Sequence, residues 1–128
     1  MNFKNKNILI IENEAVIALD IKNIFLNKGY NVVGITTSLN ETIEKMRNFK
    51  NTNLIIIDSN ITDFYEKLSV AEKIYKLFNI PLIIMTSNIS EYIKLKCENY
   101  KFIKLLKKPF AHDDLFNIIS SSFITESN

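Results

Sequence analysis

The sequence predicts an α/β fold in which a doubly wound, five-stranded parallel sheet carries helices on both faces. Two observations lead to this prediction: short aliphatic and β-branched runs recur along the chain, and segments with apolar residues at helical spacing separate them. A chain of 128 residues suits one domain. We therefore expect residues 1–128 to form a single domain, with an ordered core of about residues 6–124.

The first strand is predicted over residues 7–11 and the first helix follows it directly. Four apolar residues of this helix recur at helical spacing: Ile17, Ile21, Ile24 and Phe25. Gly29 stands just beyond them, where a left-handed C-terminal cap is expected. Strand and helix together make the first of five similar units.

The next unit begins with a strand over residues 30–35. Residues 38–41, with the sequence SLNE, match a capping box and predict the start of a second helix. Ile43 and Met46 are expected on its inward face. The third strand, residues 53–58, is apolar on both faces and should therefore lie in the centre of the sheet.

The second half of the chain continues the alternation. A third helix is predicted from Val70, Ile74 and Leu77. Pro81 then precedes a fourth strand at a position where its missing N–H does little harm. The remaining elements are a short polar helix over residues 92–97, a strand over residues 101–106, and a final helix with Leu115, Ile118, Ile119 and Phe123 inward.

Five strand–helix units predict the flavodoxin-like strand order 2-1-3-4-5, in which ligands bind beyond the carboxyl ends of the strands. Glu12 and Asn13 follow the first strand, and they should converge with Asp58 at the end of the neighbouring third strand. Their oxygens are suitable ligands for Mg²⁺. Thr86 adds a hydroxyl and Lys108 a cation. Such a set predicts a site that accepts a phosphoryl group.

Four blocks of this sequence resemble successive parts of response-regulator receiver domains: ILIIENEAVIALDIKNIFLNKGYNVVGI, LIIIDSNI, IPLIIMTSN and LLKKPF. The resemblance covers nearly the whole chain. It implies that Asp58 accepts a phosphoryl group from a histidine kinase. It also implies that Thr86 hydrogen-bonds this group, that Lys108 forms an ion pair with it, and that the peptide bond before Pro109 is cis.

The same resemblance implies a Mg²⁺ site. Its ligands would be Glu12, Asn13, Asp58 and the backbone carbonyl of Asn60. The family most often has Asp where this chain has Asn13, so we expect weaker metal binding, although an amide oxygen can still coordinate Mg²⁺. Leu105 replaces an aromatic residue that the family often couples to the threonine, and this puts aromatic-switch signalling in doubt.

Two other functions stay open. A degenerate receiver that acts as a phosphorylation-independent interaction module would explain Asn13 and Leu105. An unrelated flavin- or nucleotide-binding enzyme is disfavoured because the only glycines, Gly29 and Gly34, leave no phosphate-binding loop. No residue set supports turnover of an external substrate, so we expect a phosphoryl acceptor that could dephosphorylate itself and not a metabolic enzyme.

Composition limits the partners. The net charge is +2, and Arg47 is the only arginine among 16 basic residues, which gives little reason to expect direct nucleic-acid binding. Aliphatic runs are far too short to span a bilayer, no signal peptide is recognisable, and a single cysteine suits a reducing compartment. We therefore expect a cytoplasmic protein whose partners are a histidine kinase and an unknown output domain or target protein.

Overall fold

The computed structural model describes residues 6–49, 51–58 and 63–127 and contains one sheet of five parallel strands. Its spatial order is β2-β1-β3-β4-β5, which confirms the predicted fold class and strand order. The strands are β1 (Asn7–Ile11), β2 (Asn31–Thr36), β3 (Leu54–Asp58), β4 (Leu82–Thr86) and β5 (Ile103–Lys107). The helices are α1 (Ala15–Asn27), α2 (Leu39–Lys45), the 3₁₀ turn η1 (Met46–Asn48), α3 (Phe64–Phe78), α4 (Glu91–Glu98) and α5 (His112–Ser127).

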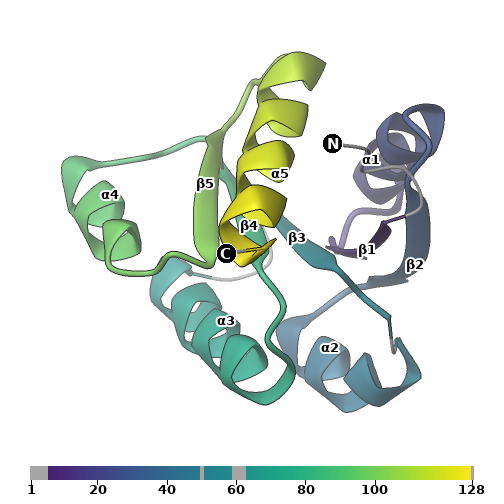
Figure 1. The fold of residues 1–128 in the computed structure, drawn as a ribbon, viewed down its shortest axis with the longest axis horizontal. Coiled ribbons are helices and arrows are strands. Elements are labelled where there is room, and N and C mark those ends of the chain that lie inside the picture. The colour runs from purple at the N-terminus through teal and green to yellow at the C-terminus, as the bar shows by residue number, and fades with distance from the viewer. Residues whose placement is uncertain (1–5, 50, 59–62, 128) are drawn as a thin grey trace.

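Helices cover both faces of the sheet (Figure 1). Helices α1 and α5 pack on one face, where Phe25 and Leu115 belong to a buried cluster with Ile8 and Ile10 of β1. The opposite face carries α2, α3 and α4. Since successive side chains of a strand point to opposite faces, both faces of the central strands must be apolar, and every residue of β3 and β4 is buried.

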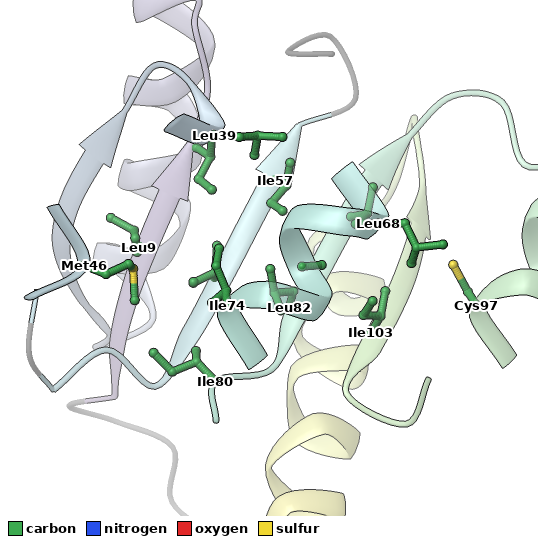
Figure 2. Close-up of a cluster of buried hydrophobic side chains, with 14 residues drawn as sticks. Leu9, Leu39, Met46, Ile57, Leu68, Ile74, Ile80, Leu82, Cys97 and Ile103 are labelled. Atoms are coloured by element: carbon green, nitrogen blue, oxygen red, sulfur yellow. The ribbon is translucent and has the colours of Figure 1, made fainter. Parts of the chain in front are cut away.

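Figure 2 shows the cluster beneath α2, α3 and α4. Leu9, Leu39 and Ile57 converge there with Leu68 and Ile74 of α3. Leu68 belongs to the first turns of α3 and packs in the same cluster as Ile57, the residue before the carboxyl end of β3. The beginning of α3 is therefore held against the edge of the sheet where Asp58 lies.

Two predicted helix ends are observed, one of them with a different bonding pattern. Gly29 has a φ of 90°, as the predicted left-handed cap requires. The hydroxyl of Ser38 accepts a hydrogen bond from the N–H of Glu41, so the first half of the predicted capping box is present. The Glu41 carboxylate instead accepts hydrogen bonds from the N–H and hydroxyl of Thr37. The Glu41 carboxylate therefore binds Thr37, the residue before the cap, and not the N–H of Ser38 that a capping box predicts.

Helix α3 is present as predicted, but the three residues that predicted it do not share one environment. Ile74 is buried and Val70 is partly buried, whereas Leu77 is 64% exposed. The stripe that faces the sheet passes through Lys67, Ala71 and Ile74 and reaches the partly buried Phe78. These residues follow the spacing i, i+4, i+7 and i+11 of one helix face, and Leu77 lies beside it.

Two further predictions concern the start of β5 and the position of Phe123. Strand β5 begins at Ile103, two residues later than predicted, because the two residues before it form a turn. The predicted inward position of Phe123 lies outside the side chains that the structure describes. Within the described residues, every helix is too short or too polar to cross a lipid bilayer.

Candidate functional site

The candidate site lies at the carboxyl edge of the sheet, where four of the predicted residues meet. Glu12 follows β1, Asp58 ends β3, Thr86 ends β4 and Lys108 follows β5. Parallel strands end at the same edge, so the sheet itself delivers these side chains to one place. The Nζ atom of Lys108 lies 2.7 Å from Oδ2 of Asp58.

Asp58 is almost completely buried, with 1% of its surface exposed. The Lys108 side chain keeps 25% of its surface in contact with solvent while its ammonium group donates a hydrogen bond to Asp58. The backbone N–H of Lys108 also donates to the carbonyl of Thr86 at 2.9 Å, which ties the segment after β5 to the end of β4. The Lys108–Pro109 peptide bond is cis, as the resemblance implied.

Glu12 is the second buried carboxylate of the site, at 1% exposure. Its Oε1 atom accepts a hydrogen bond from the N–H of Glu14 at 3.0 Å, whereas no donor among the described residues reaches its buried Oε2 atom. Burial raises the pKa of Glu12 to about 7; the bond from Glu14 opposes this rise and the neighbouring Asp58 adds to it. Glu12 therefore changes its charge close to neutral pH.

Thr86 and Asn13 occupy different parts of this edge. The Thr86 side chain is nearly buried, and its Oγ1 atom accepts a hydrogen bond from the N–H of Asn88 at 3.3 Å. Asn13 is exposed in the bend between β1 and α1. Asn60, the predicted carbonyl ligand, lies outside the described residues.

The donor set fits Mg²⁺. This ion typically uses one or two carboxylates and fills its remaining positions with water or phosphate oxygens. Glu12 and Asp58 supply two carboxylates, and the unpartnered Oε2 atom of Glu12 is a buried oxygen that a cation would satisfy. No cluster of three or more His, Cys, Asp or Glu side chains suited to a metal exists among the residues described, so any further ligands would have to be amide, carbonyl or water oxygens.

One residue of the site was missed in the sequence. Lys67, in the first turns of α3, is only 3% exposed. Burial lowers the pKa of its ammonium group, the charges of Asp58 and Asp63 act to raise it, and the charge of Lys108 adds to the lowering. The sequence does contain an indication of this burial, because Lys67 shares the helical spacing of the apolar residues Ala71 and Ile74.

Comparison with known proteins identifies the family of the chain. The family model described as response regulator receiver domain matches residues 8–120. The phyllosphere-induced regulator PhyR of Methylorubrum extorquens is 31% identical over 71 residues, which are 56% of this chain and 27% of that protein. The chain thus matches about a quarter of the length of this curated relative.

Solved structures share the fold over nearly the whole chain. A CheY-like response regulator receiver domain protein from Methanospirillum hungatei is 25% identical with a TM-score of 0.77, covering 97% of this chain and 98% of that one. The response regulator PhyR from Brucella abortus is 24% identical with a TM-score of 0.75, covering 96% of this chain and 49% of that one. This second likeness speaks for the fold alone.

Proposed function

The chain belongs to the family of response regulator receiver domains, and we propose that it is a working phosphoacceptor of a two-component signal transduction system. In this proposal a histidine kinase donates a phosphoryl group to Asp58 in the presence of Mg²⁺. The observation that supports it best is the buried Asp58 carboxylate, paired with Lys108 at 2.7 Å and neighboured by the buried carboxylate of Glu12. Residues 1–128 would act as one cytoplasmic domain.

The chemistry follows from these contacts. A carboxylate oxygen of Asp58 attacks phosphorus while the phosphorus–nitrogen bond of a phosphohistidine breaks, so the donor histidine leaves and an acyl phosphate forms. Mg²⁺ held by Glu12 and Asp58, with Asn13 and the Asn60 carbonyl as further ligands, would neutralise charge on the phosphoryl oxygens.

Two side chains of the protein would then change partners. The ammonium group of Lys108 exchanges its bond to Asp58 for one to a phosphoryl oxygen, a contact between full charges. The side chain of Thr86 would turn so that its hydroxyl donates to another phosphoryl oxygen, and this turn would move its oxygen away from the N–H of Asn88. Because the N–H of Asn88 begins the loop before α4, this exchange would alter the surface near α4. The altered surface would signal to an output domain or target protein.

A second candidate is a receiver that acts as an interaction module without phosphorylation. Its support is that Asn13 is exposed and uncharged, and that Leu105 is packed against the core beneath α4 with no aromatic ring to move. In this case the fold would be retained for its surface, and Asp58 and Lys108 would form a static ion pair.

A beryllofluoride titration distinguishes the two candidates. In the presence of Mg²⁺, we expect amide NMR signals of Thr86 and Lys108 to shift in the wild type and to stay unchanged in Asp58→Asn. The Asn13→Asp variant should respond at a lower Mg²⁺ concentration because it regains a carboxylate ligand. If these amide signals shift in Asn13→Asp but not in the wild type, the interaction module is favoured. If they shift in neither protein, phosphoacceptance is rejected.

A further inference from the structure

A further buried charged side chain near the acceptor site (Glu12, Asp58, Thr86 and Lys108) is that of Lys67, on helix α3, which carries no residue of the proposed phosphoryl chemistry. Lysines are rarely buried unless they meet compensating charge. Lys67 is 3% exposed and is the only basic residue that is buried within the part of the chain the structure describes. Other lysines of the same helix, such as Lys73 and Lys76, are exposed, as is usual. The burial of Lys67 therefore calls for a local reason.

The position of Lys67 on α3 favours an approach of its side chain to the acceptor site. It shares the inward stripe of the helix with Ala71 and Ile74, and it precedes Leu68, which packs in the same cluster as Ile57 (Figure 2). Side chains on a helix lean towards its N-terminus. Helix α3 follows the carboxyl end of β3, and its first turns pack beside Ile57, so a side chain that leans this way leans towards the edge of the sheet that carries Asp58.

Charges at this edge agree with that direction. Burial lowers the pKa of Lys67, the carboxylates of Asp58 and Asp63 act to raise it, and the ammonium group of Lys108 adds to the lowering, so the Lys67 ammonium group interacts with the charges of this edge. Asp63 is exposed and caps α3, so the buried carboxylates of the site are Glu12 and Asp58. Two lysines, Lys67 and Lys108, stand against them, and these four formal charges sum to zero when both carboxylates are ionised.

We propose that Lys67 is a built-in counter-cation of the acceptor site, which supplies part of the positive charge that Mg²⁺ brings to a receiver domain and thereby weakens Mg²⁺ binding. This inference rests on the proposed function in taking Asp58 and Glu12 as the Mg²⁺ ligands. Asn13 acts in the same direction, because it removes a negative charge where the family most often has one. Both features would make the acceptor site less dependent on the metal for charge balance.

The test is the Mg²⁺ affinity of variants at Lys67. The chain contains no tryptophan, so binding is best followed by calorimetry and by amide NMR shifts during a titration with MgCl₂ alone. We expect Lys67→Gln to bind Mg²⁺ about tenfold more tightly than the wild type, because a repelling unit charge has gone. Lys67→Arg keeps the charge and Lys73→Gln removes one from the exposed face of the same helix, so both should stay close to the wild-type affinity.

The outcomes separate this inference from the proposed function. If Lys67→Gln is folded by its amide spectrum and its affinity stays within twofold of the wild type, or falls, the inference is wrong. If the wild type binds no Mg²⁺ and Lys67→Gln does, the inference holds while the wild-type phosphoacceptor function fails. Should Lys67→Gln not fold, the side-chain ammonium signal of Lys67 in the wild type decides: it must shift with Mg²⁺ while that of Lys73 does not, and an unchanged Lys67 signal rejects the inference.

Discussion

The buried carboxylate of Glu12 makes the stability of the metal-free protein depend on pH. An ordinary glutamate has a pKa of 4.5, and burial raises that of Glu12 to about 7. The folded protein therefore holds this proton until near neutral pH, while the unfolded chain releases it near pH 4.5. The stability that Glu12 contributes is fully present below pH 4.5 and is lost as the pH rises through 7. At about 1.4 kcal/mol for each pH unit between the two values, the loss reaches about 3 kcal/mol.

The Glu12→Gln variant removes this dependence. A glutamine cannot ionise, and its amide oxygen can still accept the hydrogen bond from the N–H of Glu14. We expect the difference in free energy of unfolding between Glu12→Gln and the wild type to grow by about 3 kcal/mol in favour of the variant as the pH rises from about 4 to about 8.

Urea unfolding followed by circular dichroism, with EDTA present and the pH stepped from 4 to 8, measures the difference. Glu14→Gln, at an exposed position, is the matched control and should follow the wild type. Parallel pH profiles of Glu12→Gln and the wild type would refute the reasoning.

Three further substitutions test the contacts around the site and the core. Lys108→Met leaves the buried Asp58 carboxylate without its ion-pair partner and should lower the free energy of unfolding at pH 7 by about 2 kcal/mol. The loss should be smaller than for a fully buried pair because the Lys108 side chain is partly exposed. Unchanged stability in urea unfolding would contradict the pairing. Gly34→Ala would place a Cβ atom 2.5 Å from Cε1 of Phe49. Gly34→Ala should therefore lower the free energy of unfolding by about 1–3 kcal/mol, and a second substitution, Phe49→Leu, should restore part of this loss. If the double variant is no more stable than Gly34→Ala, the clash with the Phe49 ring is not the cause. Ser38→Ala removes the cap of α2 and should lower stability by about 1 kcal/mol in thermal unfolding, whereas a loss near zero would show that the cap is dispensable.

The elements and their order could be predicted because they depend on local patterns. Continuous aliphatic runs such as Leu54–Asp58 can be satisfied only by strands buried on both faces, and alternation with helices then requires parallel neighbours. Parallel strands end at one edge. Asp58 and Lys108, which lie 50 positions apart in the chain, could therefore be expected from the sequence to meet, and their 2.7 Å contact agrees with this expectation.

Other details were not determined by local pattern and depend on how the elements dock. Leu77 and Phe78 both lie near the apolar stripe of α3, and the packing of that helix on β3 and β4 decides which of them faces the core. The Glu41 carboxylate can reach the N–H of Ser38 or of Thr37, and the path of the chain from β2 into α2 selects Thr37.

Lys67 shows most clearly which features follow from the sequence and which arise only when the elements dock. The sequence by itself determined a receiver fold with Asp58, Glu12, Thr86 and Lys108 at one edge, because strand ends and their neighbours follow from pattern and topology. It also placed Lys67 on an apolar stripe, where a long, flexible side chain can either reach out to solvent or turn inward. Only the tertiary structure decided this point, because burial and electrostatic compensation arise when α3 docks over the end of β3 beside other charged groups.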